Sequence, residues 1–307
     1  MNDSKEQWSE QRALRVLSGE DRSIGATLLR GVLSVAEPFY AAAMTARNAL
    51  YDARVFASQS LPRPTISVGN LTTGGTGKTP VVQWLAREFA SRGLRPAILM
   101  RGYRAASTGG SDEQRMLQNS FGDDAIVIAN PDRIAGAAEA MGQSRPPDVF
   151  ILDDAFQHRR VRRDFNLVLI DGWDPFANRH VLPRGLLREP IRGIKRADAI
   201  VITRAVHWQV FDEVFLEIRR FNKDAPIYLA DHIHTALLRR SSDEPCAEEI
   251  SLDHLKASRF FAFAGIANPR ALEHQLREHG QTFAGFRAFP DHHGYAAGDL
   301  RDLNAAA

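Results

Sequence analysis

The sequence has almost no cysteine. Cys246 is the only one among 307 residues, so the chain has neither an internal disulfide framework nor a zinc site built from cysteines. A reducing compartment is therefore expected. The chain also lacks an apolar run approaching the roughly 18 residues of a membrane span. Its polar opening, residues 1–6, lacks the apolar core of a secretory signal.

An excess of charge of one sign is also missing. The 39 lysines and arginines nearly balance the 37 aspartates and glutamates, and a net charge of +2 gives no support for nucleic-acid binding. We find no internal repeat and no low-complexity tract. The remaining composition, 44% hydrophobic and 25% charged, is that of an ordinary globular protein. A chain of 307 residues is long enough for one large domain or two ordinary ones.

The sequence does contain a series of short apolar runs. They lie at residues 65–68, 96–100, 125–129, 149–152, 167–170 and 199–202. Unbroken runs rich in β-branched residues, separated by helical patterns, are typical of buried parallel strands. Polar residues follow several of these runs, at the carboxyl ends of strands where such sheets bind ligands. We therefore predict an α/β fold with a mostly parallel sheet flanked by helices.

The pattern changes on both sides of this region. A strand at 225–230 and a strand–turn–helix unit from residue 260 predict a second, smaller α/β domain beyond a boundary near residue 225. Before the sheet, apolar residues recur at near-helical spacing, and Pro38 is expected to kink or restart that helix. A helix of this kind can lie in a membrane interface or pack on the core or a partner, and periodicity leaves both open. The expected domains are residues 1–58, 59–225 and 226–307.

The most informative stretch is a glycine-rich loop between a strand-like run and an amphipathic helical run. It contains Gly74, Gly75, Thr76, Gly77, Lys78 and Thr79. Such a loop lets backbone N–H groups surround nucleotide phosphates, while the lysine reaches the β- and γ-phosphates and the threonine hydroxyl binds Mg²⁺. Thr72 stands where the longer P-loop pattern has glycine, so the loop resembles the shorter G-G-x-G-K-[ST] form. A glycine turn followed by a chance Lys-Thr pair is the alternative.

Two pairs of acids have the positions that phosphoryl transfer requires. Asp153 and Asp154 directly follow an apolar run, as expected of carboxylates that organise a metal ion. Caps or turns at the strand end are the alternative. Asp112, followed by Glu113, could accept the proton of an acceptor hydroxyl. On local evidence it could equally cap a helix.

Two further motifs are less specific. Arg188 can grip phosphate bidentately, with Glu189 beside it for a metal ion, and a surface ion pair is the alternative. Asp291 precedes His292 and His293, and an Asp–His pair suits an acid–base imidazole. Taken alone, such a pair is more often structural.

Together, these motifs resemble one family. In chain order they are Ser67–Pro80, Arg101-Gly102-Tyr103, Asp112-Glu113, Asp153–His158, Leu182–Pro190, Gly265–Pro269 and Phe289–His293. Their order and rough spacing, over about residues 25–303, are similar to those of tetraacyldisaccharide 4'-kinase, the lipid A 4'-kinase of Gram-negative bacteria. No single motif decides this, but the ordered set is very specific.

The resemblance implies transfer of the γ-phosphate of ATP, with Mg²⁺, to the 4'-hydroxyl of a tetraacylated glucosamine disaccharide 1-phosphate. It implies a two-domain, P-loop NTPase-like kinase whose acceptor enters a cleft between the domains. It also implies that the N-terminal helix dips into the membrane, on the cytoplasmic face of the inner membrane. The expected partners are the acylated lipid and the membrane surface, without nucleic acid, and a monomer is expected.

The resemblance also assigns roles to residues. Asp112 and His292 match the catalytic pair that deprotonates the sugar hydroxyl, and Lys78 and Thr79 bind phosphate and Mg²⁺. The remaining organisers of metal and nucleotide phosphate are Asp153, Asp154, Gln157, Arg188 and Glu189. Thr79, the two aspartates and Glu189 are the expected metal ligands.

The sequence departs from the family pattern in several places. Ser111, Gln114, Ala155, Arg184 and Leu186 replace residues that are usually glycine, proline, glycine, alanine and proline. These replacements change loop stiffness more than chemistry. The sequence ends at Ala307, where relatives normally continue, so a small domain lacking one or two strands is expected. That departure bears on the placement of His292.

Two other functions stay open at this point. One is a nucleotide-dependent switch or metallochaperone NTPase of the G-G-x-G-K-[ST] type, although Thr73 stands where such ATPases often carry a second lysine. The other is a catalytically silent relative that binds nucleotide without transferring phosphate. Hydrolysis without a lipid acceptor would favour the first, and binding without transfer the second.

Overall fold

The computed structural model describes residues 13, 15–102, 112–205, 211–233, 235–239, 248–254, 259–266, 269–279, 283–289 and 293–306. The chain divides into two compact units. The larger is Val16–Asp231, and the smaller joins Met1–Arg15 to His232–Ala307. The boundary falls later than the expected residue 225, because the strand that follows that position completes the large sheet.

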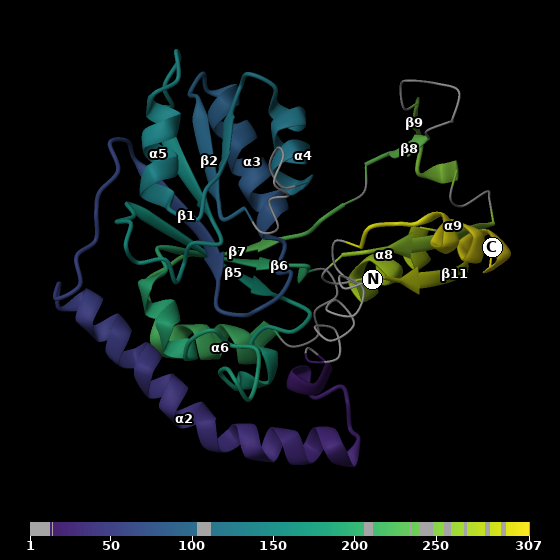
Figure 1. Cartoon of the computed structure of the whole chain (residues 1–307), viewed down its shortest axis with the longest axis horizontal. Coiled ribbons are helices and arrows are strands. Elements are labelled where there is room, and N and C mark those ends of the chain that lie inside the picture. The colour runs from purple at the N-terminus through teal and green to yellow at the C-terminus, as the bar shows by residue number, and fades with distance from the viewer. Residues whose placement is uncertain are drawn as a thin grey trace. The chain divides into compact units, whose positions relative to one another are not determined.

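The larger unit is built on a seven-stranded sheet of order β3-β2-β4-β1-β5-β6-β7 (Figure 1). Its strands are β1 (Thr65–Asn70), β2 (Pro96–Met100), β3 (Ile126–Ala129), β4 (Val149–Asp153), β5 (Phe165–Asp171), β6 (Ala199–Thr203) and β7 (Ile227–Ala230). Every neighbouring pair is parallel, which confirms the predicted α/β class. β1 lies between β4 and β5, so the chain diverges to either side of the strand that precedes the glycine loop. A crevice at such a switch point is where parallel sheets bind ligands.

Helices cover both faces of this sheet. α3 (Lys78–Ser91) and α4 (Asp112–Phe121) pack on one face, where Val82, Ala86 and Leu117 join a buried cluster with alternate strand residues. α5 (Arg133–Met141), α6 (Phe211–Phe221) and the 3-10 helix η2 (Ile191–Arg196) pack on the other. A short 3-10 turn, η1 (Ala177–Arg179), precedes η2. Burial on both faces explains why the strands read as unbroken apolar runs.

The N-terminal helix α2 (Ile24–Asp52) belongs to the larger unit. Ser23 caps it, because its side-chain oxygen accepts from the Ala26 N–H at 3.3 Å. Pro38 lies inside the helix, which bends along its length in Figure 1 but does not restart. Tyr40 and Ala41 pack against the core of the sheet.

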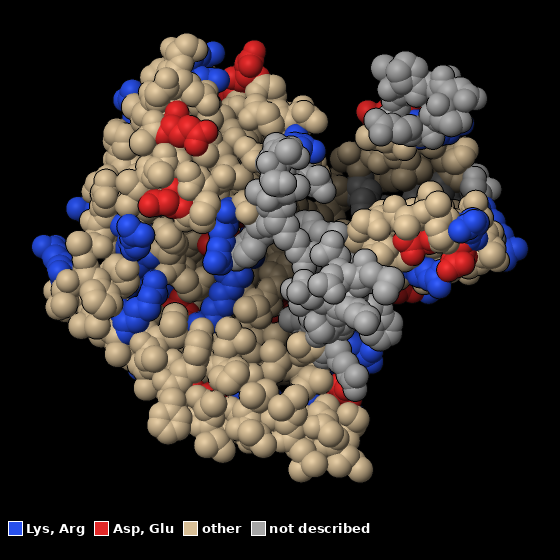
Figure 2. All heavy atoms as spheres, viewed as in Figure 1, with Lys and Arg blue, Asp and Glu red and all other residues tan. Residues whose placement is uncertain are grey.

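The first half of α2 carries exposed apolar side chains. Ile24, Leu28, Val32, Val35 and Phe39 are each between 67% and 82% exposed. Their spacing places them on one stripe of the helix. In Figure 2 the surface over α2 is nearly without charged side chains on the face shown. Among the described helices, none is long and apolar enough to cross a membrane.

The smaller unit contains a second parallel pair. β10 (Phe260–Ala264), α8 (Pro269–His279) and β11 (Phe283–Ala288) form the expected strand–turn–helix unit and its return strand. β8 (Leu237–Arg239) pairs antiparallel with β9 (Glu248–Ile250), and α9 (Ala297–Ala306) follows β11. A βαβ unit with an added hairpin makes this unit α/β as well.

Candidate active site

The glycine loop has the backbone of a phosphate cradle. It follows β1 directly, and α3 begins at Lys78, as the sequence predicts. Gly74 and Gly77 have φ values of 141° and 75°, a region that other residues rarely adopt. Gly77 is the residue before the first turn of α3, so the positive end of the helix dipole lies at the loop.

Side chains from the end of β6 hold the loop from outside. The Thr203 hydroxyl donates to the Thr76 carbonyl at 3.0 Å, and Arg204 Nη2 donates to the Gly75 carbonyl at 2.8 Å. Arg204 also pairs with Asp171 at the end of β5, through a 2.8 Å bond from Nε and a second contact from Nη2. These contacts fix the Gly75 and Thr76 carbonyls, and with them the backbone of the loop. The loop is therefore preorganised for an anion.

Arg204 itself is fixed on both sides. Its φ of 55° is a left-handed value that costs energy for a residue with a side chain. Gly172 packs directly against it, where an added Cβ would meet the Thr203 and Arg204 carbonyl oxygens at 2.8 and 2.9 Å. The ends of β5 and β6 therefore pack against each other and together support the glycine loop.

A chain of charges runs across the mouth of the loop. Lys78 Nζ lies 3.5 Å from Asp154 Oδ1, and Arg188 Nη1 donates to both Asp154 oxygens at 2.8 and 2.9 Å. Lys78 also donates to Asn70 Oδ1 and to the Gly74 carbonyl, each at 3.4 Å. The structure thus brings together Lys78, Asp154 and Arg188, three of the residues that the sequence motifs place in the site.

The pKa of Asp154 shows what this pairing does. Burial by itself raises the pKa, but the Lys78 ammonium and the Arg188 guanidinium outweigh burial and hold the pKa below its ordinary value. A depressed pKa means that the pairing contributes stability above the unfolded-state pKa, and that this contribution is lost as pH falls through the folded value. Asp154 is therefore ionised at neutral pH, where it pairs with Lys78 and Arg188.

Arg188 reaches the loop because its segment pairs with the loop. Thr72 and Leu187 form an antiparallel bridge, and the Thr73 N–H donates to the Leu186 carbonyl at 2.7 Å. The Arg188 N–H donates to the Leu71 carbonyl, also at 2.7 Å. The segment that resembles a family motif is thus hydrogen-bonded along the entry to the phosphate cradle.

Two oxygen-bearing side chains of the kind that Mg²⁺ binds lie at the same edge. Asp153 ends β4, lies in register with Val68 of β1 and is 7% exposed, and Thr79 lies in the first turn of α3, directly after the loop. A carboxylate and a hydroxyl fit Mg²⁺, which keeps several waters and takes phosphate oxygens as well. Within the described part of the chain, no group of three or more His, Cys, Asp or Glu side chains forms a complete metal site.

The carboxylate of Glu189 is held by other partners, and its expected role as a metal ligand remains a prediction. The residue is 1% exposed, and both carboxylate oxygens already accept two hydrogen bonds each. The donors come from Asn48, Gln157 and Arg196 at 2.7 to 3.0 Å. Glu189 is therefore a buried carboxylate that accepts four hydrogen bonds. Gln157 lies beside it, and its side chain donates to the Asn70 carbonyl at 2.8 Å.

The expected catalytic pair is only partly visible. Asp112 is the first residue of α4, and its side chain lies outside the described residues. His292 also lies outside them. Its neighbour His293 pairs with Asp299 at 3.0 Å and stacks on Phe289 with ring centroids 4.7 Å apart. The Asp112–His292 assignment therefore remains a prediction.

Some site residues carry little signal that sequence reasoning could use. Asn48 lies 141 residues before its partner Glu189, and Arg204 follows its partner Gly75 by 129 residues. Arg196 lies only seven residues after Glu189, but no motif marks it. Arg204 is noticeable in the sequence only as a polar residue after an apolar run. Asn48 lies in a helix whose pattern indicates only an apolar face.

We predict that Arg204→Ala weakens nucleoside triphosphate binding about tenfold, because the Gly75 carbonyl and the Asp171 carboxylate each lose a charged donor. Arg204→Lys keeps the charge but not the forked geometry, and an intermediate loss is expected. Calorimetric titration with the nucleotide measures both, with Arg92→Ala at the exposed end of α3 as the control. A folded Arg204→Ala variant with unchanged affinity would contradict the supporting role.

Comparisons with known proteins agree with this geometry. A family model described as tetraacyldisaccharide-1-P 4'-kinase matches residues 29–307. A tetraacyldisaccharide 4'-kinase of Geobacter metallireducens is 39% identical over 294 residues, covering 91% of this chain and 83% of that protein. One of Pelodictyon phaeoclathratiforme is 35% identical over 274 residues, covering 84% and 76%.

A solved structure is similar as well. LpxK from Aquifex aeolicus, in complex with ATP, has a TM-score of 0.68 and 32% identity to this chain. The similarity covers 88% of this chain and 84% of that one. The family match includes residues of both compact units and is not confined to the glycine loop.

Proposed function

We propose a function from one premise: the chain belongs to the tetraacyldisaccharide-1-phosphate 4'-kinase family. It transfers the γ-phosphate of ATP to the 4'-hydroxyl of a tetraacyldisaccharide 1-phosphate, in the biosynthesis of lipid A. The observation that carries this proposal is the contact of Lys78 and Arg188 with Asp154 beside the glycine loop. The segment that contains Arg188 is hydrogen-bonded to the residues that lead into this loop. A glycine turn followed by a chance Lys-Thr pair would not be expected to bring these three charged side chains together.

Different residues of the protein bind the phosphates, compensate the charge of the transferred group and accept the proton. Loop N–H groups and Lys78 hold the nucleotide phosphates, and Lys78 exchanges its contact with Asp154 for a phosphate oxygen. Arg188 compensates the charge that spreads over the transferred group. A bond forms between the 4'-oxygen and the γ-phosphorus as the bond to the bridging β–γ oxygen breaks, and ADP leaves. Asp112 and His292 are proposed as the pair that takes the hydroxyl proton.

Mg²⁺ would be held by Thr79 and Asp153, with phosphate oxygens and waters completing its shell. Bound there, the ion supplies charge neutralisation to the phosphates. Asp154 contributes through Lys78 and Arg188, and Glu189 through the position of Gln157. Of the residues expected to bind the metal, Thr79 and Asp153 are thus proposed as the direct ligands.

The acceptor requires an enzyme that works at a membrane. Four acyl chains, at about 0.8 kcal/mol per buried CH₂, keep the lipid in the bilayer. The apolar stripe of α2 can insert beneath the head groups on the cytoplasmic face of the inner membrane. We propose that residues 1–58 serve this attachment, that the P-loop unit binds ATP, and that the protein works as a monomer.

We predict that serine at Ile24, Val32 and Phe39 together releases the protein from vesicles. Each inserted side chain contributes about 1.5–3 kcal/mol, so partitioning should fall at least about 100-fold. Sedimentation with phospholipid vesicles measures this, and Leu216→Ser, which alters an equally exposed leucine on α6, is the matched control. Unchanged sedimentation of the triple variant would remove α2 from the membrane role.

The function is tested by incubating the protein with γ-labelled ATP, Mg²⁺ and tetraacyldisaccharide 1-phosphate in detergent. Labelled lipid should accumulate, and chelation of Mg²⁺ should stop it. Lys78→Met protein, purified in the same way, controls for contaminating kinases. Hydrolysis of ATP without labelled lipid would indicate a switch or metallochaperone-type NTPase. Binding of ATP without either reaction would indicate a silent family member.

A further inference from the structure

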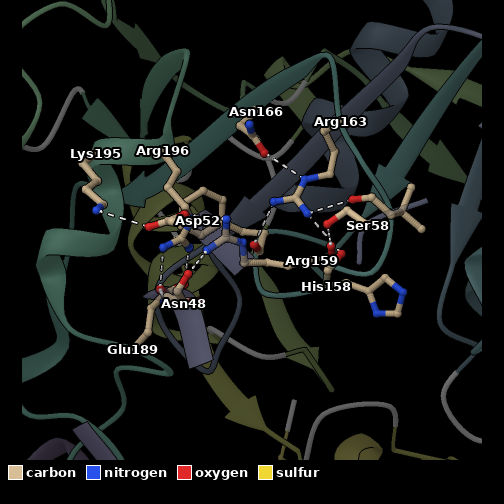
Figure 3. A network of polar contacts seen from close by, with 12 residues as sticks. Asn48, Asp52, Ser58, His158, Arg159, Arg163, Asn166, Glu189, Lys195 and Arg196 are labelled. Carbon is tan, nitrogen blue, oxygen red and sulfur yellow. Dashed lines mark hydrogen bonds and ion pairs between the residues drawn. The ribbon is translucent and has the colours of Figure 1, made fainter. Parts of the chain in front are cut away.

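The buried carboxylate of Glu189 joins three separate parts of the larger unit (Figure 3). Asn48 Nδ2 of α2 donates to Oε2 at 2.7 Å, and Arg196 of η2 donates to both oxygens at 2.7 and 2.9 Å. Gln157, in the loop after β4, donates to Oε1 at 3.0 Å. One charge thus connects the N-terminal helix, the loop after β4 and η2.

The carboxylate is closely packed on the side of Gly193, and a cavity of about 150 Å³, lined by Asn48 and Arg196 among others, lies beside it. An added Cβ at Gly193 would meet Glu189 Oε2 at 2.6 Å and Arg196 Nη1 at 3.2 Å. A carboxylate at 1% exposure depends on its donors, because a buried charge that loses a hydrogen-bond partner is destabilised. Displacing α2 therefore changes the hydrogen bonding of Glu189 directly.

Helix α2 makes further polar contacts in the same place. Tyr40 OH donates to the Arg188 carbonyl at 2.9 Å, and Arg47 Nη2 donates to the Gln157 carbonyl at 2.9 Å. Arg159 Nη1 donates back to the Asn48 carbonyl at 2.8 Å. The second half of the helix is thus hydrogen-bonded to the main chain of the two segments that carry the phosphate-facing side chains.

From Glu189 the contacts continue to the phosphate loop. The amide of Gln157 that meets Glu189 also donates to the carbonyl of Asn70, the last residue of β1, at 2.8 Å. The side chain of Asn70 accepts from Lys78 at 3.4 Å. Arg188, adjacent to Glu189 in the chain, holds Asp154. The same few groups therefore set the position of α2 and of the lysine.

We propose that Asn48 is a positioning residue for the nucleotide site, so that docking of the second half of α2 and binding of ATP strengthen each other through Glu189 and Gln157. This inference rests on the proposed function only for the identity of the nucleotide. Coupling of this kind is reciprocal: whatever loosens α2 lowers nucleotide affinity, and bound nucleotide suppresses opening of α2 by the same factor.

The test uses the full chain with an ATP analogue that resists hydrolysis, together with Mg²⁺. Asn48→Ala should weaken analogue binding about tenfold in calorimetry, as expected for loss of one donor to a buried charge. Thr45→Ala is the matched control, because it removes a contact between α2 and Arg192 that does not reach Glu189. It should change affinity less than about twofold.

Hydrogen exchange gives a second measurement, which would not change if Asn48 had only a structural role. In the unaltered protein, the analogue should slow exchange of the amides in residues 40–52. In Asn48→Ala this slowing should largely disappear, while Thr45→Ala keeps it. In steady state, the KM for ATP should rise in Asn48→Ala with the KM for the lipid unchanged.

Two results would overturn the inference: analogue binding by Asn48→Ala as tight as by Thr45→Ala, or no slowing of exchange in α2 when the analogue binds. If the unaltered protein phosphorylates the lipid and either result is found, the proposed function stands and only the coupling fails. If the unaltered protein binds no nucleotide, both fail.

Discussion

Replacing Lys78 with methionine should lower kcat/KM for ATP by about 10³-fold or more, while the protein stays folded. The ammonium group is the cation within the glycine loop itself, and it lies 3.5 Å from Asp154 and 3.4 Å from the Gly74 carbonyl. Such a group acts on charge that develops during transfer, and its loss is correspondingly large. Methionine keeps most of the side-chain length and removes the charge.

The fold should tolerate this change because Asp154 keeps its other partner. Arg188 still donates to both of its oxygens, so the carboxylate is not left as an uncompensated buried charge. Thermal unfolding of Lys78→Met should therefore stay close to that of the unaltered protein. Glu88→Gln on the exposed side of α3, which weakens only a surface pair with Arg92, is the control for both measurements.

Activity of Lys78→Met within tenfold of the unaltered protein would contradict the assignment of the loop. Loss of activity together with loss of the folded state would not count in its favour, so circular dichroism accompanies the assay. A loss confined to KM for ATP would assign Lys78 to ground-state binding, whereas a loss in kcat assigns it to the transition state.

The core of the fold was predictable because its signal is local. β2 spans the apolar run Pro96–Met100 and no more, and β4 and β6 each extend the predicted run by one residue. Parallel strands covered on both faces must be apolar throughout, so their sequence pattern is unambiguous. The glycine loop was equally visible, because its function requires particular residue types at adjacent positions.

Contacts between distant segments were not predictable from the pattern. Glu189 has the residue type of a metal ligand, but its partner Asn48 lies 141 residues earlier in a helix with its own apolar periodicity. β7 was expected in the second domain, since an apolar run does not tell which sheet it joins. Its register with β6, from Ile200–Ile227 to Thr203–Ala230, places it in the first. Only the three-dimensional arrangement separates these alternatives.

The helix start at Asp112 offers the sharpest test of the remaining catalytic assignment. α4 follows β2, so its first residue lies at the carboxyl edge of the sheet, the edge at which the glycine loop also begins. A carboxylate there can serve as a base or can simply stabilise the helix start. The substitution Asp112→Asn separates the two roles, because asparagine supports a helix start about as well as aspartate and cannot accept a proton.

We therefore expect Asp112→Asn to reduce kcat by about 10²–10⁴-fold with the affinity for ATP nearly unchanged. The thermal stability should stay near that of the unaltered protein, whereas Asp132→Ala, which removes a defined cap from α5, should lower stability without a matching loss of turnover. Full turnover by Asp112→Asn would indicate that Asp112 only stabilises the start of α4. A parallel loss of ATP affinity would place it with the nucleotide, because a base for the acceptor has no contact to lose until the sugar hydroxyl arrives.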